Sequence, residues 1–165
     1  MIAKHPDQRV GVFVDVSNMY YSAKNIYGRK VNFGAVLRTA VGKRKLIRAI
    51  AYVIEAGELG EEAFFKALSK EGFEVRIKEL QVFPGGIKKG DWDVGIAIDM
   101  IRLSQKLDAV VLVSGDGDFL PLVEYLKNQG QQVELVAFGK SASAKLIESC
   151  DDFIDLDRNP KRYLL

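Results

Sequence analysis

Acidic side chains follow the two most apolar runs of this chain. Asp116 and Asp118 come shortly after the run at residues 109–113, and Asp15 comes directly after the run at residues 10–14. An unbroken apolar run of this kind is typical of a strand that is buried on both faces of a parallel sheet. Such sheets bind ligands at the carboxyl ends of their strands, so we expect these acids to meet at one edge. Carboxylates gathered there indicate a metal site.

A further acid is expected at the same edge. Asp93 lies in the first turn of a predicted helix, which should begin near the carboxyl end of the third strand. Four carboxylates placed close together raise one another's pKa values, and a divalent cation relieves their repulsion. Mg²⁺ takes carboxylate oxygens, waters and substrate phosphate as ligands, and two such ions assist phosphodiester hydrolysis. The sequence therefore predicts a metal site formed by Asp15, Asp93, Asp116 and Asp118.

Two of these four aspartates, and the nearby Asn18, also have a local structural explanation. Asp118 could cap the helix that follows it, Asp93 could complement the N-terminus of its own helix, and Asn18 could be a helix cap as well. Asp15 and Asp116 have no evident local role of this kind. Because all four acids are expected at one place, the metal site is the interpretation that we favour.

Two basic segments are candidates for holding substrate phosphates. Lys88 and Lys89 follow a pair of glycines and precede the expected metal ligand, although a solvated loop would explain them equally. Lys140 and Ser141 lie between a strand and a helix, where backbone N–H groups can bind phosphate. This second segment is not a P-loop, because Glu134 stands where the first glycine of that motif belongs.

Three aromatic side chains flank the predicted metal site. Tyr20, Tyr21 and Trp92 could stack on exposed bases, or they could be part of the core. A third basic cluster at residues 43–48 is a further candidate for phosphate binding, although such a run is more often a solvated turn. These assignments depend on where the tertiary structure places each side chain.

Asp99 stands apart from the other acids. It lies on the same predicted helix as Asp93, with apolar neighbours on both sides in the sequence. A carboxylate that is buried among apolar residues needs a hydrogen-bonding or charged partner. We therefore expect Asp99 to have a structural or supporting role rather than to ligate a metal directly.

Predicted strands and helices alternate along the chain. Strands are expected at residues 10–15, 46–54, from 73 onward, 109–113 and 133–138, with an edge strand at 153–154. Helices are expected from residue 17 or 18 to 27, after Asn32, at 61–71, from about 91–93, after Pro121, and from Ser141 to about 149.

This alternation implies a three-layer α/β fold with a mostly parallel sheet of five to six strands and helices on both faces. We expect the core strand order 3-2-1-4-5, in which the first and fourth strands are neighbours. Asp15 and Asp116 would then lie at the point where the winding of the sheet reverses.

Length and composition limit the remaining possibilities. The 165 residues predict a single domain, with a core at about 10–156, a polar N-terminal leader and a short C-terminal tail. A net charge of +2 excludes a polybasic nucleic-acid binder, so any such partner must be held by local patches. One cysteine, Cys150, cannot form an internal disulfide, and the chain has neither an apolar membrane span nor the core of a signal peptide. A cytoplasmic protein without membrane contact is expected.

Three motifs occur in order along the chain: Asp15-x-x-Asn18, Lys89-Gly90 followed by Asp93 and Asp99, and Ser114-Gly-Asp-Gly-Asp-Phe119. As a set, over about residues 10–156, they resemble the NYN domain family in its LabA-like branch. The resemblance implies a PIN-like, Rossmann-like fold and metal-dependent ribonuclease chemistry. It also implies that the four aspartates named above hold Mg²⁺ or Mn²⁺, with RNA as the partner.

One motif departs from the family pattern, which is usually Lys-Gly-x-Asp. Here Asp91 and Trp92 separate the glycine from Asp93, so either acid is a candidate ligand. We prefer Asp93, because its spacing to Asp99 matches the family. Asp99 and Ser114 are assigned supporting or structural roles.

Two functional hypotheses follow. In the first, the four aspartates hold the metals, water attacks the phosphodiester to leave a 5′-phosphate and a 3′-hydroxyl, and Asn18 orients Asp15 or contacts the scissile phosphate. In the second, the chain is a non-catalytic RNA- or protein-binding regulatory domain that retains the acidic site. A third possibility, a phosphatase of the HAD type with Asp15 as nucleophile, is disfavoured, because it would need a second acid where Ser17 stands. The sequence leaves open a homodimer or another protein partner.

Overall fold

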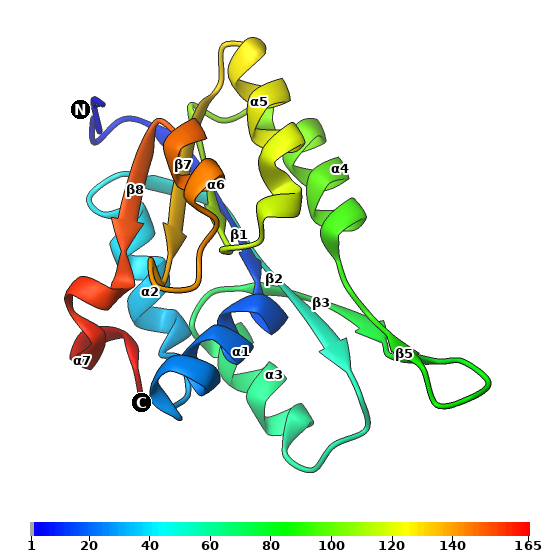
Figure 1. The fold of residues 1–165 in the computed structure, drawn as a ribbon. Helices are drawn as coiled ribbons and strands as arrows, with labels where there is room; N and C mark the ends of the chain where they lie inside the picture. The colour runs from blue at the N-terminus through cyan, green and yellow to red at the C-terminus, as the bar shows by residue number, and fades with distance from the viewer. Residues whose placement is uncertain (1) are drawn as a thin grey trace.

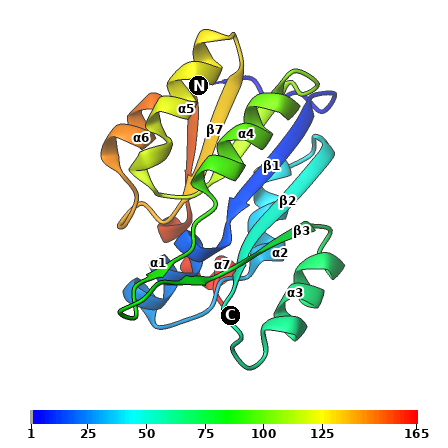
Figure 2. The same cartoon turned by 90° about the vertical axis from the view of Figure 1, so that its right-hand side faces the viewer.

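A six-stranded parallel sheet lies between two layers of helices (Figures 1 and 2). The computed structural model describes residues 2–165, and of Lys89 it describes the backbone only. The strands of the main sheet are β1 (Arg9–Asp15), β2 (Lys45–Glu55), β3 (Glu74–Glu79), β6 (Ala109–Val113), β7 (Gln132–Ala137) and β8 (Asp152–Asp155). This architecture confirms the predicted three-layer α/β fold.

The helices alternate with these strands. They are α1 (Val16–Tyr27), α2 (Phe33–Val41), α3 (Glu61–Lys70), α4 (Asp93–Ser104), α5 (Leu120–Asn128), α6 (Ala144–Ser149) and α7 (Pro160–Tyr163), with 3₁₀ turns η1 (Gly117–Phe119) and η2 (Leu156–Arg158). Glycines with positive φ angles, Gly28 and Gly42, follow α1 and α2, as their C-terminal glycine signals predict. In the described part of the chain, no helix is long and apolar enough to cross a membrane.

The strand order is β3-β2-β1-β6-β7-β8, which confirms the predicted core order and adds the predicted edge strand. β1 pairs with β2 on one side and with β6 on the other, all in parallel. The winding of the sheet therefore reverses between β1 and β6. Val14 is opposite Val113 in this pairing. The residues that directly follow these two positions, Asp15 and Ser114, therefore lie side by side at the same edge of the sheet.

Both faces of the sheet are covered, which explains the unbroken apolar runs. Along β1, Val12 and Val14 join a core with residues of α1, α2 and α3, while Phe13 points into a second core with residues of α4, α5 and α6. Each strand residue thus has an apolar layer to pack against, whichever way it points. The ends of the central strands are therefore held between two packed layers of helices.

A small antiparallel hairpin replaces the flexible basic loop that the sequence suggested. Its strands β4 (Gln81–Val82) and β5 (Lys88–Lys89) pair with each other and form a separate two-stranded sheet. Gly85 and Gly86 both have positive φ angles, of 92° and 82°, which suit a tight turn. Lys88 is exposed on this hairpin, and the side chain of Lys89 lies outside the described residues.

The C-terminal segment contributes to the core, although the sequence suggested only a short tail. Tyr163 and Leu164 are buried, and Leu164 forms an isolated bridge with Val31. A second difference concerns α6, which is capped by Ser143 and not by Ser141, because the Ser143 hydroxyl accepts a hydrogen bond from the N–H of Leu146.

Candidate metal centre

Ser114 joins the ends of the two central strands. It follows β6 and is fully buried. Its hydroxyl donates to Oδ2 of Asp15 at 3.1 Å and accepts from the backbone N–H of Asp116 at 3.2 Å. The parallel register of β1 and β6 makes this contact possible, since it places Ser114 beside Asp15. Ser114 therefore holds both acids in place, in keeping with the supporting role that the sequence suggested.

Asn18 provides a second link between the same two segments. Its backbone N–H donates to Oδ1 of Asp15 at 3.3 Å, and its side-chain oxygen accepts from the N–H of Gly115 at 2.9 Å. Asn18 thus holds Asp15 on one side and the loop carrying Asp116 on the other. The contact with Asp15 comes from the backbone, so the part of this link that is specific to the Asn18 side chain is its bond to Gly115.

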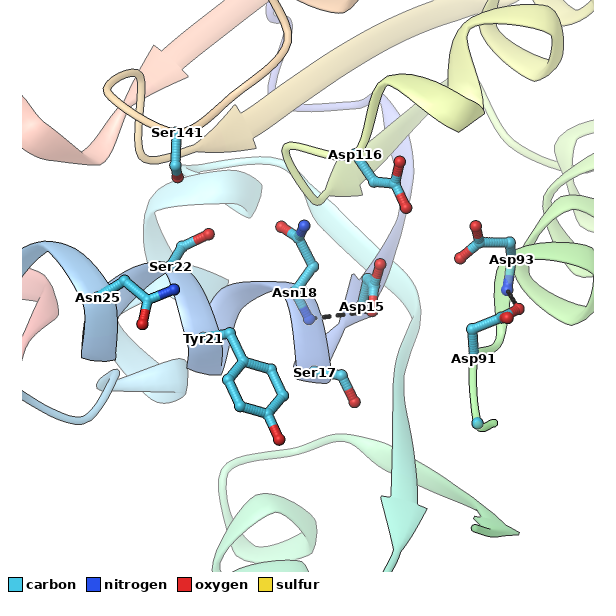
Figure 3. A pocket seen from close by; sticks show the side chains of 11 residues that line it. Asp15, Ser17, Asn18, Tyr21, Ser22, Asn25, Asp91, Asp93, Asp116 and Ser141 are labelled. Carbon is cyan, nitrogen blue, oxygen red and sulfur yellow. Dashed lines mark hydrogen bonds between the residues drawn. The ribbon is translucent and has the colours of Figure 1, made fainter. Parts of the chain in front are cut away.

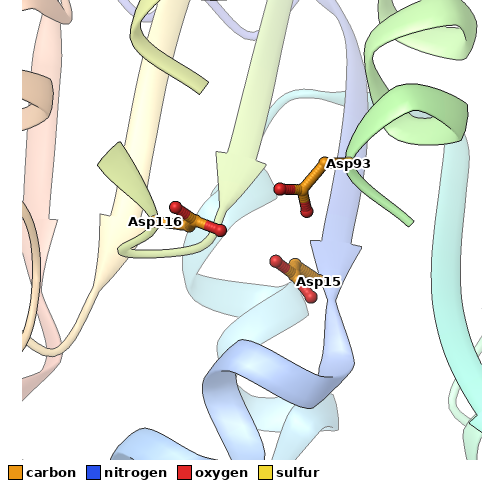
Figure 4. Close-up of side chains that lie close together, drawn as sticks. All are labelled: Asp15, Asp93 and Asp116. Atoms are coloured by element: carbon orange, nitrogen blue, oxygen red, sulfur yellow. The ribbon is translucent and has the colours of Figure 1, made fainter. Parts of the chain in front are cut away.

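Three carboxylates from three separate elements converge at this edge (Figure 4). Asp15 ends β1, Asp116 lies in the loop after β6, and Asp93 begins α4. One oxygen from each carboxylate lies within 4.8 Å of the others. Asp15 is buried, and the other two are half-buried. The predicted meeting of strand ends and helix start therefore occurs for these three residues.

Asp118 and Asp91 lie outside this group of three. Asp118 is exposed, and its backbone N–H donates to Oδ1 of Asp116 at 2.9 Å. Asp91 is also exposed, and its carboxylate accepts from the N–H of Asp93 at 3.2 Å. Of the two candidates left open by the departure from the family motif, Asp93 is the one that joins Asp15 and Asp116.

The acids at the strand ends also have local roles that the sequence did not reveal. The carboxylate of Asp15 caps α1, and that of Asp116 caps the 3₁₀ turn η1. Each position therefore needs a side chain that can accept a hydrogen bond, although the cap itself does not need an acid. An asparagine could accept the same hydrogen bonds, so capping alone does not account for negative charge at both sites.

Burial and mutual repulsion favour the protonated forms of two of the three carboxyl groups. Burial, with the charges of Asp116 and Asp15 next in importance, raises the pKa of Asp93 from 3.8 to about 7. Burial also raises the pKa of Asp15 from 3.8 to about 6, although hydrogen bonds from Asn18 and Ser114 lower it in part. A bound divalent cation would favour the ionised forms of both groups.

We expect the metal-free protein to lose stability as pH rises from about 4 to about 7. The raised pKa values of Asp15 and Asp93 mean that the folded state holds more protons than the unfolded state in this window. Their stabilising contribution is complete below the unfolded value of 3.8 and is lost as pH passes the folded values of about 6 and 7. After allowance for solvent screening, the loss should be about 1–3 kcal/mol.

Urea unfolding in EDTA across this pH range would measure the effect, with Asp93→Asn as the comparison. This variant should show a shallower decline, and added Mn²⁺ should reverse the slope because metal binding requires deprotonated ligands. An equally steep decline in Asp93→Asn would show that this carboxyl group does not cause it.

The donor set fits a hard divalent cation. All three groups offer carboxylate oxygens, which Mg²⁺ and Mn²⁺ prefer. Two oxygens bound to one Mg²⁺ lie at most about 4.2 Å apart, so separations within 4.8 Å need only small side-chain movements to close around an ion. The pocket above the carboxylates has a volume of about 440 Å³, which leaves space for waters and for a phosphate group.

One face of α1 forms the other side of this pocket (Figure 3). Asn18, Tyr21, Ser22 and Asn25 all line it. Asn18 and Tyr21 were expected near the site from their positions in the sequence, whereas Ser22 and Asn25 were not. Tyr21, Ser22 and Asn25 follow Asn18 by three, four and seven residues, which places all four side chains on one face of the helix. This polar stripe was the sequence signal that could have identified Ser22 and Asn25.

The segment around Lys140 does not offer the phosphate cradle that its sequence suggested. The N–H of Gly139 donates to Asp155 and that of Lys140 to Asp157, at 2.9 and 2.8 Å. The Lys140 ammonium lies over the ring of Tyr27, 5.4 Å from its centre. Only Ser141, from this segment, lines the pocket among the described residues.

The basic cluster at residues 43–48 is largely used within the fold. Arg44 is buried and forms a two-pronged ion pair with Glu134 at 2.8 and 2.9 Å. Arg48 pairs with Glu74 at 2.6 Å. Arg44 is therefore not accessible to a phosphate, and Arg48 already has an acidic partner.

The aromatic residues near the site divide into two kinds. Trp92 is half-buried, packs against Tyr52 and donates its indole N–H to the carbonyl of Val53 at 2.9 Å. It belongs to the packing of α4 on the sheet and not to an open surface. Tyr21, by contrast, is 58 % exposed at the rim of the pocket.

Asp99 is a buried, paired acid, as predicted. It is 6 % exposed, accepts a hydrogen bond from the Tyr52 hydroxyl at 2.8 Å and pairs with Arg76 at 3.0 Å. We expect Asp99→Ala to destabilise the fold by about 1–3 kcal/mol, because both partners lose their acceptor. Urea unfolding would measure this, and Asp99→Asn, which keeps an acceptor for Tyr52, should cost less.

Calorimetry with Mn²⁺ separates this structural role from ligation. Affinity should fall less in Asp99→Ala than in Asp15→Ala, because only the second variant removes a member of the group of three. Equal losses in the two variants would place Asp99 among the metal ligands.

Comparisons with known proteins identify relatives of this chain. The chain is 28 % identical over 157 residues to the low amplitude and bright protein LabA of Synechococcus elongatus, which covers 90 % of this chain and 84 % of that protein. It is similar to the crystal structure of a protein of unknown function from Vibrio parahaemolyticus, with a TM-score of 0.88, 32 % identity, and coverage of 99 % and 100 %.

A T5 protein that was co-crystallized with metal ions shares the fold, with a TM-score of 0.50 and 14 % identity over 85 % of this chain and 59 % of that one. The model of the family described as NYN domain matches residues 9–157. That match includes every strand of the main sheet and all three converging carboxylates. The chain therefore belongs to the NYN domain family.

Proposed function

We propose that this protein is a divalent-metal-dependent ribonuclease that hydrolyses RNA phosphodiester bonds. One observation carries the proposal: carboxylates from β1, α4 and the loop after β6 approach within 4.8 Å of one another in an open pocket. Membership of the NYN family and a PIN-like fold support it. Asp15, Asp93 and Asp116 would hold Mg²⁺ or Mn²⁺, and Asp118 stands close enough for its charge to raise the pKa of Asp93.

A metal bound by these residues would lower the pKa of water and stabilise charge on the leaving oxygen. The chain's own contribution is to fix the ligands. Ser114 and Asn18 hold Asp15 and the loop of Asp116 from both sides. Asp15 itself is buried, with 7 % of its surface exposed. Such preorganisation is what a phosphoryl-transfer site requires.

Cleavage of labelled single-stranded RNA by the purified chain tests the proposal. We expect products with a 5′-phosphate and a 3′-hydroxyl in Mn²⁺ or Mg²⁺, and none in EDTA. Asp7→Asn is a matched control, since the Asp7 side chain is 94 % exposed, and this variant should cleave normally. Cleavage that persists in EDTA would contradict the proposal. So would a nuclease activity that separates from this protein during purification.

A non-catalytic RNA- or protein-binding regulatory role is the second candidate. The observation in its favour is that none of the eleven described residues lining the pocket is a cation, so the described lining gives little charge to hold a phosphate backbone. This role predicts Mn²⁺ binding, measured by calorimetry, without cleavage of any RNA. Metal binding together with metal-dependent cleavage favours the enzyme.

A further inference from the structure

The pocket extends from the carboxylates along α1. Beyond Asn18, its wall is formed by Tyr21, Ser22 and Asn25 (Figure 3). From Asn18 to Asn25 the helix rises by roughly 10 Å, so this wall reaches well past the converging carboxylates. None of these three residues is needed to hold the acidic group, and all three side chains are neutral.

Tyr21 offers an accessible aromatic ring at the rim of the pocket. It is 58 % exposed, although a ring of this size is usually more buried in a folded protein. Its ring centre lies 5.2 Å from that of Tyr20, at an interplanar angle of 86°, so the two rings meet edge to face. An exposed aromatic ring of this kind provides a stacking surface for an unpaired base.

Ser22 and Asn25 supply polar groups next to this ring. In the described part of the chain, the hydrogen bonds that a side chain makes with another pocket residue lie at the acidic end, between Asn18 and Asp15 and between Asp91 and Asp93. A serine hydroxyl and an asparagine amide can each donate and accept. The 2′-hydroxyl of ribose also donates and accepts, which makes it a suitable partner that deoxyribose lacks.

We propose that Tyr21, Ser22 and Asn25 form a nucleoside subsite, which holds one unpaired nucleotide beside the carboxylate group and distinguishes ribose from deoxyribose. The inference rests on the proposed function, because it assigns the part of RNA that this wall contacts. The pocket volume of about 440 Å³ is in the range of sites for single small ligands. A base within a duplex would have to leave its stack to reach Tyr21, so unpaired strands are favoured.

Binding of fluorescein-labelled single-stranded RNA, and of DNA with the same sequence, tests the subsite by anisotropy in Mn²⁺. All proteins carry Asp116→Asn, so that cleavage does not alter the ligand. Tyr21→Ala should weaken RNA binding by roughly tenfold to one-hundredfold, the loss expected for one base–aromatic stack, and Tyr21→Phe should restore it. Tyr125→Ala is the matched control, because Tyr125 is 47 % exposed on α5 and does not line the pocket.

The choice of sugar is tested with Asn25→Ala and Ser22→Ala. Each should reduce the preference for RNA over DNA by about twofold to tenfold, the range for one hydrogen bond, with little change in DNA binding. Asn128→Ala, at the end of α5, is the control for a helical asparagine outside the pocket.

The possible results separate this inference from the proposed function. If the parent protein binds RNA and Tyr21→Ala and Asn25→Ala bind it equally well, the subsite is wrong while the ribonuclease proposal stands. Equal binding of RNA and DNA by the parent overturns the assignment of ribose recognition. If the parent binds neither strand and the intact chain cleaves no RNA, both the subsite and the proposed function fail.

Discussion

Replacing Asp116 by asparagine should abolish RNA cleavage and leave the metal-free fold as stable as before or more so. The asparagine keeps an oxygen that can accept the N–H of Asp118, now bonded to the carboxylate at 2.9 Å. It removes one negative charge from a group in which Asp15 and Asp93 already have raised pKa values. Activity should fall by more than the roughly 100-fold that a partner of a metal ligand typically costs.

Product formation in Mn²⁺ and thermal unfolding in EDTA measure the two effects. Asp118→Asn is the matched comparison, because Asp118 is exposed and lies outside the group of three; this variant should lose less activity. If the two variants are equally inactive, Asp118 acts as a fourth ligand. A large fall in the melting temperature of Asp116→Asn would show that the negative charge itself is structural.

Replacing Arg44 by methionine should cost about 3–5 kcal/mol of stability, the largest stability loss that we expect from a single substitution here. The side chains of Arg44 and Glu134 are each 2 % exposed. The same guanidinium also donates to the carbonyls of Ala40 and Val41 at the end of α2. Its removal leaves the Glu134 carboxylate buried, with Gln132 and the more distant Lys4 as its remaining partners among the described residues.

Urea unfolding of two further variants provides the controls. Arg48→Met breaks the more exposed pair with Glu74 and should cost at most about 1 kcal/mol. The double variant Arg44→Met with Glu134→Leu should recover much of the loss, because neither charge is then left alone in the interior. If Arg44→Met lowers the free energy of unfolding no more than Arg48→Met does, the buried pair of Arg44 and Glu134 does not stabilise the fold as its geometry implies.

The fold class, the strand order and the meeting of Asp15 with Asp116 could all be predicted from the sequence. These follow from local features: apolar runs mark strands that are buried on both faces, and glycines after α1 and α2 end those helices. Right-handed crossovers then leave few possible orders for a parallel sheet. Residues that leave β1 and β6 must share an edge once these two strands are neighbours.

The tertiary structure alone decided which side chains belong to the site and which are used elsewhere. Arg44 lies in a basic run that suggests a surface, yet it meets Glu134, 90 positions away, in the interior. The backbone N–H groups of Gly139 and Lys140 bind the carboxylates of Asp155 and Asp157 instead of facing a phosphate.

The physical reason is the range of the interactions. Periodicity and turn residues reflect contacts within one element, and these are encoded by neighbours in the sequence. The pairing of a long charged side chain depends on the distance and direction between elements after the layers have packed, and local patterns contain neither. The polar stripe on α1 illustrates this limit: its spacing is visible in the sequence, but only the packed structure shows that Ser22 and Asn25 line the same pocket as the carboxylates.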